Sequence, residues 1–306
     1  MIIRKYETSD EKNWEDLVKR CKNPAFVLTR RFLQYHENKF DDYSLVVYND
    51  NFLIAALPAC RQENVWYAHP GLPFADLIMA DRYNWTITKD IVSKIILFLK
   101  EAGFTKMIVK IMPQMYKKLP GDEWLYYLRN FGARLFEQKL TTAIPLIEYE
   151  NIRKDVINIS KQNKRNFIIK EAGDQLTDLY ELMKKNMAEK YNSLPTHTLA
   201  DLLKLQKLFP EKINCIAGFE GEELKGGIIL FIYESVVKVQ YIFSSQQFLA
   251  DVLLLKTVEL YRSGYTFIDL GTSNSLPNNE INYGVLPFKA KNGGKAFIVE
   301  SYELLF

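Results

Sequence analysis

The chain has 306 residues, of which 48% are hydrophobic and 25% are charged, so it can bury a core in one large or two ordinary domains. Its formal net charge of +3 excludes a polyelectrolyte that binds nucleic acid or membranes through bulk charge. Three scattered cysteines, Cys21, Cys60 and Cys215, exclude a disulfide framework and are typical of buried thiols in a reducing compartment.

The first ten residues are polar and charged, and they lack the apolar core of a signal peptide. The longest uncharged apolar stretch, near residues 52–60, is too short to span a bilayer. We therefore expect a cytoplasmic protein with no integral membrane association.

Alternating apolar residues and turn signals predict strands and then a helix in the first half of the chain. The predicted elements are strands at 43–48, 52–60 and 65–68, a helix at 91–102 and a strand at 104–109. Gly103 stands where a glycine would supply the left-handed C-cap of that helix. Residues 129–132, with the sequence Arg-Asn-Phe-Gly, then lead into a predicted strand at 134–147.

A helical segment separates this pattern from its recurrence in the second half. Leu176, Leu179, Tyr180 and Met183 fall at helical spacing, so two or three helices are predicted within residues 151–210. The pattern then returns as strands at 213–219, 224–233 and 236–243, a helix at 251–263, and strands at 265–270 and 295–305.

Two glycine positions recur at nearly one spacing. Gly264, after the second long helix, follows Gly103 by 161 residues, and Gly294 follows Gly132 by 162 residues. Two matches at one spacing favour an internal duplication. We therefore expect two related lobes, each a strand meander followed by a helix, a strand, a short helix and a strand.

Common cofactor and nucleophile motifs are absent. The sequence contains neither G-x-G-x-x-G nor G-x-S-x-G, and the Gly-Gly-Lys at 293–295 fails the P-loop pattern because alanine follows it. His36, His69 and His197 lie far apart, without cysteines or carboxylates at ligand spacing. No metal or redox cofactor is therefore expected.

Several short segments of the second half carry a family resemblance. They are 161–166 (KQNKRN), 195–199 (PTHTL), 240–241 (QY), 268–273 (IDLGTS) and 282–289 (NYGVLPFK). In this order they resemble the Fem-type aminoacyl transferases and their GNAT relatives. In the first half, residues 57–59 (LPA) and 69–73 (HPGLP) are similar to the first lobe of that family.

The resemblance implies an α/β (α+β) fold of two tandem GNAT-like lobes, each a mixed, mostly antiparallel sheet flanked by helices. It implies a lobe of residues 1–150 on the acceptor side, and a donor and catalytic lobe of residues 151–306 that carries the helical insert. The implied reaction is acyl transfer from a thioester, such as acyl-CoA (acetyl-CoA) or an acyl carrier, to an amine of an envelope sugar, nucleotide-linked or peptidoglycan-type precursor.

Two alternatives stay open. The first is a Fem-type transferase that takes its donor from aminoacyl-tRNA, with tRNA as a partner. The second is a catalytically silent GNAT-fold binding protein, since a fold can persist without its chemistry. One departure bears on the donor: residues 244–251 contain neither the glycine nor the arginine with which GNAT enzymes cradle the coenzyme A pyrophosphate, and Asp251 is expected to oppose phosphate there.

Three residues are predicted to be catalytic. Lys289 would hold a phosphate or stabilise the tetrahedral intermediate, and its alternative is a solvated surface lysine. Asp269 would accept the amine's proton or orient the nucleophile, and its alternative is capping the following loop. Tyr241 would line the acyl pocket and donate its hydroxyl to the reacting carbonyl, or it is plain core.

Further residues are predicted to bind substrate. Lys164 and Arg165 belong to a basic cluster that would bind phosphates, or they lie on a solvated helix face. His197 is a conceivable general base or an ordinary loop histidine, and His69 binds acceptor or fixes a turn. The resemblance implies the same role for Gln240, Ser273, Asn282, Tyr283 and Phe288.

Overall fold

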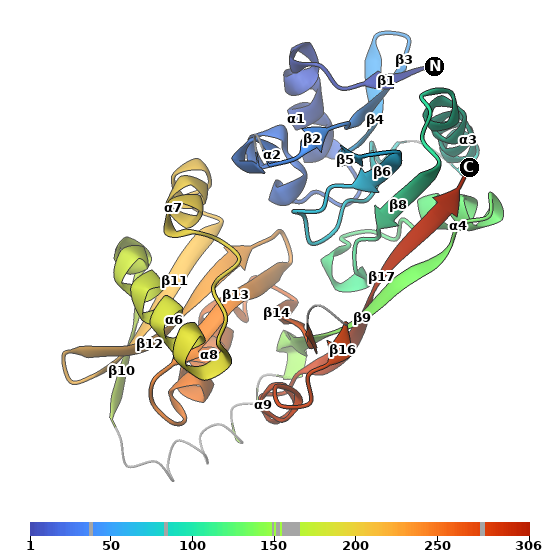
Figure 1. The fold of residues 1–306 in the computed structure, drawn as a ribbon. Coiled ribbons are helices and arrows are strands. Elements are labelled where there is room, and N and C mark those ends of the chain that lie inside the picture. Colours follow the sequence, from blue (N-terminus) through green and yellow to red (C-terminus); the bar gives the residue numbers. More distant parts are fainter. Residues whose placement is uncertain (37–38, 83–84, 149, 151–153, 155–165, 276–278) are drawn as a thin grey trace. The chain divides into compact units, whose positions relative to one another are not determined.

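The computed structural model describes the chain except for residues 37–38, 83–84, 149, 151–153, 155–165 and 276–278 (Figure 1). The described residues divide into two compact units. Unit 1 contains Met1–Lys139 and Ile298–Phe306, and unit 2 contains Leu140–Phe297. These units are defined by contacts between residues, and the assignment of residues 1–150 to the acceptor and 151–306 to the donor stays a prediction.

Unit 1 contains two groups of paired strands with helices beside them (Figure 1). The helices are α1 (Glu11–Arg20), α2 (Arg30–Leu33), α3 (Trp85–Glu101) and α4 (Glu123–Asn130). One group is antiparallel, in the order β1 (Ile2–Lys5), β3 (Leu45–Asn49), β4 (Phe52–Leu57), β7 (Ile78–Met79). The other has the order β17 (Lys295–Leu305), β8 (Lys106–Lys110), β6 (Val65–Ala68), β5 (Ala59–Gln62), β2 (Asp41–Asp42), and its β6–β8 pair is parallel.

Two tryptophans fill the core of unit 1 without leaving a buried donor unpaired. Trp14 and Trp66 are completely buried. The indole N–H of Trp14 donates to the carbonyl of Leu28 at 2.8 Å, and that of Trp66 donates to the carbonyl of Tyr43 at 3.0 Å. Each ring therefore buries a large apolar area while its polar atom keeps a hydrogen bond.

Unit 2 contains one large sheet flanked by helices, besides a small two-stranded sheet (Figure 1). Its helices are α6 (Leu176–Tyr191), α7 (Leu199–Leu208), α8 (Leu249–Tyr261) and α9 (Leu286–Lys291). The strand order is β10 (Phe167–Glu171), β11 (Ile213–Glu220), β12 (Glu223–Ile232), β13 (Val236–Ser244), β14 (Phe267–Thr272), β9 (Arg134–Pro145). The β13–β14 pair is parallel and the other pairs are antiparallel.

Consecutive glycines on β12 let helices approach both faces of this sheet. A Cβ on Gly226 would lie 3.2 Å from Leu249 of α8, whereas a Cβ on Gly227 would lie 2.4 Å from Leu179 of α6. Successive strand residues face opposite sides, so the two helices cover opposite faces. Apolar residues of α8, such as Leu253, then complete a core with the strands beneath.

We expect Gly226→Ala to destabilise the protein, because the new Cβ would lie 2.6 Å from the backbone carbonyl oxygen of Phe243, which cannot rotate away. Such overpacking costs about 1–3 kcal/mol of unfolding free energy, measurable by urea denaturation. Gly264→Ala is the matched control, since nothing lies within 4 Å of its Cβ. Equal stabilities of the two variants would contradict the predicted clash between a Cβ at Gly226 and the backbone of Phe243.

The predicted repeat is present, with one correction. Gly103 has a φ of +82° after α3, as a left-handed cap requires. Gly264 is not in the left-handed region, so its predicted capping role is wrong: α8 ends earlier, at Tyr261. Gly132 after α4 and Gly293 after α9 both have positive φ, and this pair is 161 residues apart.

The described residues between β14 and Lys289 contain secondary structure of their own. Strands β15 (Asn274–Ser275) and β16 (Glu280–Ile281) pair in antiparallel fashion, and α9 then begins at Leu286. Lys289 therefore lies on a short helix that starts with Leu286-Pro287, a proline position that helices accept because its missing N–H has no intrahelical partner to lose.

Two further expectations concern thiols and membrane spans. Cys21, Cys60 and Cys215 are free and buried, as predicted. Burial raises the pKa of Cys21 to about 11 and the pKa values of Cys60 and Cys215 to about 12, so the thiols stay protonated at neutral pH. Among the described residues, no helix is both long and apolar enough to cross a membrane.

Candidate functional site

Strands β13 and β14 begin side by side and then part. They pair through Val236 with Phe267, Val237 with Ile268 and Lys238 with Asp269. Gln240 is an extra residue in β13, because Ile229 pairs with Tyr241 while Leu230 pairs with Val239. Such a bulge bends a strand and increases its twist. It therefore accounts for the end of the pairing, beyond which β13 continues to Ser244.

The end of β14 is also irregular. Its register with β9 shifts between Asp269 and Thr272, and Gly271 has a φ of +75° that glycine adopts without strain. The Asp269 carboxylate accepts hydrogen bonds from the Gly271 N–H at 2.8 Å and the Thr141 hydroxyl at 3.2 Å. This is the capping geometry named as the alternative for Asp269, and its role in proton transfer stays a prediction.

Lys289 reaches from α9 to this irregular end of β14. Its Nζ donates to the carbonyl oxygens of Gly271 at 2.7 Å and Thr272 at 3.0 Å, and to Ser273 Oγ at 2.9 Å. An ammonium has three N–H donors, and these three oxygens match them in number. Lys289 is only 7% exposed, so it is not a solvated surface lysine.

The pKa of the Lys289 amine is lower than that of an exposed lysine. Burial lowers its pKa to about 8, although attraction by Asp269 raises it and repulsion by Lys238 lowers it again. A lysine with a depressed pKa can change its charge under physiological conditions, which an exposed lysine cannot. The structure thus places a titratable cation at the end of β14.

This depressed pKa predicts how stability depends on pH. Between about pH 8 and pH 10.5, the unfolded chain binds more protons at Lys289 than the folded chain, so its contribution to folding stability rises with pH. We expect the stability of the wild type, relative to Lys289→Met, to increase by about 2 kcal/mol from pH 7.5 to pH 10.

Urea denaturation at both pH values measures the difference. Lys295→Met is the matched control, because the Lys295 side chain is 55% exposed. If the stability of the wild type relative to Lys289→Met falls or stays constant with rising pH, the pKa of the Lys289 amine is not depressed.

A backbone hydrogen bond joins Asn282, the first residue of the 282–289 motif, to Ser273. The Asn282 N–H donates to the Ser273 carbonyl at 2.7 Å, and the Asn282 Oδ1 accepts from the Gly284 N–H at 3.0 Å. The Tyr283 side chain is 75% exposed, whereas Phe288 packs against the hydrophobic core. The structure therefore brings Ser273, Asn282 and Lys289 together as the sequence suggested, and it leaves Tyr283 facing solvent.

Tyr241 and His197 form a second group. The Tyr241 hydroxyl accepts a hydrogen bond from the His197 backbone N–H at 3.1 Å and lies 2.7 Å from its Nδ1. Burial raises the pKa of Tyr241, so the phenol stays neutral. The segment before α7 is thus fixed to β13 beside the half-buried Gln240.

Asp251 is paired and does not present an unbalanced charge at the start of α8. Its carboxylate lies 2.8 Å from Lys291 Nζ and accepts from the Asn292 side-chain amide at 2.8 Å. Asp251 does lie in the first turn of α8, as expected, and its opposition to phosphate stays a prediction. On the other side of this loop, Lys190 Nζ donates to the Ser244 carbonyl at 2.5 Å, which adds a cation that sequence reasoning missed.

His69 lies in unit 1 and holds a turn. Its carbonyl accepts from the Leu72 N–H at 3.0 Å, and Lys110 Nζ donates to the carbonyls of Pro70 and Leu72 at 3.0 Å each. Burial and the nearby His36 lower the pKa of His69 to about 3, so its ring is neutral at physiological pH. This is the turn alternative, and acceptor binding by His69 stays a prediction.

The basic pair Lys164 and Arg165 lies outside the described residues. Sequence reasoning missed Thr141 and Asn292, which contact Asp269 and Asp251 across long sequence separations. A signal for Asn292 was present, because Lys-Asn-Gly-Gly at 291–294 marks the recurring helix end.

Comparison with solved structures identifies the fold. FemX is 13% identical over 100% of this chain and 98% of its own, with a TM-score of 0.67. The C-terminal domain of a putative lysylphosphatidylglycerol synthetase from Agrobacterium fabrum is 13% identical over 96% and 91%, with a TM-score of 0.59. A tandem GNAT protein from the clavulanic acid biosynthesis pathway is 12% identical over 99% and 98%, with a TM-score of 0.55.

The chain has the Fem-like tandem GNAT fold. The α/β architecture of two GNAT-like lobes that the resemblance implied is therefore confirmed. No protein-family model matches the sequence, and no curated protein matches it.

Proposed function

We propose that this protein is an N-acyltransferase that moves an acyl group from a thioester donor, acyl-CoA or an acyl carrier, to an amine of a cell-envelope sugar or peptidoglycan-type precursor. The observation that carries the proposal is that the buried Lys289 ammonium donates a hydrogen bond to Ser273 Oγ. This contact lies at the end of β14, beyond the last residue pair between β14 and β13. The fold supports transfer chemistry in general, since FemX and a lysylphosphatidylglycerol synthetase share it.

The geometry suggests how the donor would be held. Beyond Lys238, the edge of β13 that faced β14 has no further strand partner among the described residues. Unpaired backbone N–H and C=O groups on such an edge can bind an extended ligand that carries amides, as an added strand would. The phosphopantetheine arm of coenzyme A or of an acyl carrier is a ligand of this kind.

The loop after β13 is compatible with a phosphorylated donor despite its lack of glycine. Lys291 and Asn292 balance the charge of Asp251, and Lys190 lies against the start of the loop. The N-terminus of the following helix α8 offers backbone N–H groups and the positive end of the helix dipole.

The reaction would form a C–N bond and break a C–S bond. The amine attacks the thioester carbonyl and loses a proton, and the departing thiolate gains one. Ser273 Oγ accepts a hydrogen bond from Lys289, so the serine hydroxyl proton remains to be donated to the developing oxyanion. Asp269 and His197 are the proposed acceptors of the amine's proton.

Incubation of the protein with candidate acceptors tests the function. Amino-sugar nucleotides and peptidoglycan precursors are offered with acetyl-CoA, a longer acyl-CoA or aminoacyl-tRNA, and products are followed by mass. Transfer from the thioester supports the proposal, and transfer only from aminoacyl-tRNA supports the alternative Fem-type reaction. If no donor supports transfer and none raises the melting temperature, the silent binding protein is the correct reading.

We expect Lys289→Ala to lower kcat/KM by about 100-fold or more, because it removes the charge behind the oxyanion donor. Ser273→Ala should reduce kcat and leave KM nearly unchanged, since its hydroxyl would act only in the transition state. Lys295→Ala, which removes an exposed cation of the same unit, serves as the control and should retain activity. Unchanged kcat/KM in Lys289→Ala would remove that residue from the site.

A further inference from the structure

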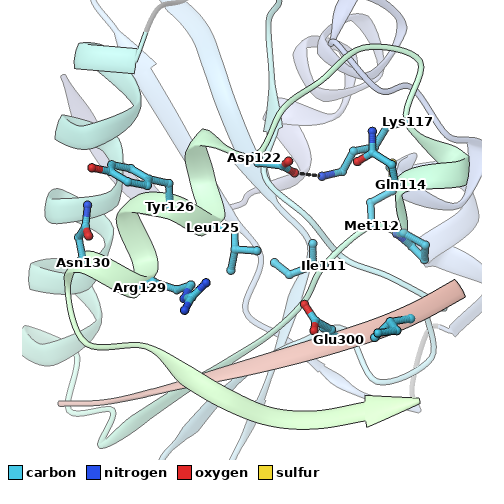
Figure 2. A pocket seen from close by; sticks show the side chains of 12 residues that line it. Ile111, Met112, Gln114, Lys117, Asp122, Leu125, Tyr126, Arg129, Asn130 and Glu300 are labelled. Carbon is cyan, nitrogen blue, oxygen red and sulfur yellow. Dashed lines mark hydrogen bonds and ion pairs between the residues drawn. The ribbon is translucent and has the colours of Figure 1, made fainter. Parts of the chain in front are cut away.

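Unit 1 contains a pocket of about 690 Å³ that the proposed acyl transfer does not use (Figure 2). It is formed by α4, by the segment that follows β8 and by the start of β17 within unit 1. Its volume lies in the range of small-molecule sites. The pocket is lined by apolar side chains and by charged side chains of both signs, so a matching ligand would carry apolar and charged groups.

The pocket is lined by two cations and two carboxylates, and only one cation forms an ion pair with one of these carboxylates among the described residues. Lys117 Nζ and Asp122 form an ion pair at 2.5 Å on one side (Figure 2). Arg129 and Glu300 also line the pocket, but within the described part of the chain no ion pair joins them. Opposite charges that face one cavity without touching leave room for a ligand that bridges them.

Glu300 is held in place by neutral donors. Its Oε1 accepts from the Gln138 side-chain amide at 3.0 Å, and its Oε2 accepts from the Tyr302 hydroxyl at 2.8 Å. These bonds orient the carboxylate, and no cation forms an ion pair with it in the part of the chain that the structure describes. A ligand ammonium would supply that cation, and a fixed acceptor loses little entropy when it binds.

Arg129 lies on α4, and its side chain is exposed. A guanidinium presents parallel N–H donors that match both oxygens of a carboxylate. Two apolar side chains point into the pocket between the two charged residues (Figure 2). Ile111 directly follows β8, and Leu125 lies on α4. Ile298 adds an apolar side chain that is 54% exposed, which a bound apolar group would shield from water.

We propose that this pocket binds a small zwitterion of the amino-acid and short-peptide class. The ligand's carboxylate pairs with Arg129, its ammonium pairs with Glu300, and an apolar side chain covers Ile111 and Leu125. A polyanion such as a nucleotide is a poorer match, because the lining has as many carboxylates as cations and attracts no net charge. All lining residues of the pocket belong to unit 1, whereas Lys289 and Ser273 belong to unit 2.

Binding of three related dipeptides tests the proposal. Leucyl-leucine carries both charges, N-acetyl-leucyl-leucine lacks the ammonium, and leucyl-leucinamide lacks the carboxylate. Calorimetry and amide NMR shifts should show leucyl-leucine binding at the pocket and each blocked form binding at least 10-fold more weakly. No binding of leucyl-leucine up to millimolar concentration, or equal binding of all three, would overturn the proposal.

Two variants assign the charges. In Arg129→Gln the free and amidated dipeptides should bind alike, whereas in Glu300→Gln the free and acetylated dipeptides should bind alike. Arg134→Gln, at an exposed arginine outside the pocket lining, is the control and should keep the wild-type preferences. Thermal unfolding checks that each variant is folded. Wild-type preferences in a folded Arg129→Gln protein would exclude the carboxylate contact.

Discussion

The ammonium of Lys289 holds the end of strand β14 in a shape that a regular strand does not have. Successive carbonyls of a strand normally point to opposite sides, yet those of Gly271 and Thr272 both accept from one nitrogen. The positive φ of Gly271 and the Asp269 carboxylate on its N–H make this turn possible. A buried cation with three oxygen partners thereby fixes both the strand end and the position of Ser273.

The second constraint is the bulge at Gln240. It bends β13 away from β14 after three residue pairs, the last of which joins Lys238 to Asp269. Two strands that start together and then part leave backbone groups on facing edges. Among the described residues, β13 therefore has no strand partner on this edge beyond Lys238. The contact of Tyr241 with His197 fixes β13 to the segment before α7.

The pocket of unit 1 is lined by charged residues in two different arrangements. Lys117 and Asp122 satisfy each other and need no ligand. Arg129 and Glu300 line the same pocket, no ion pair joins them within the described residues, and Glu300 is oriented by neutral donors. The net charge of the chain, +3, carries no information about this site, because the opposing charges cancel in any sum over the sequence.

The sequence by itself determined most strands and long helices, such as the strand at Val65–Ala68, because hydrophobic periodicity is a local property. It also determined the order of two similar lobes and singled out Lys289. Only the tertiary structure decided that Gly264 is no cap, that Lys291 neutralises Asp251 and that Lys289 is buried on a helix. These outcomes depend on contacts between residues far apart in the chain, and a local pattern does not encode such contacts.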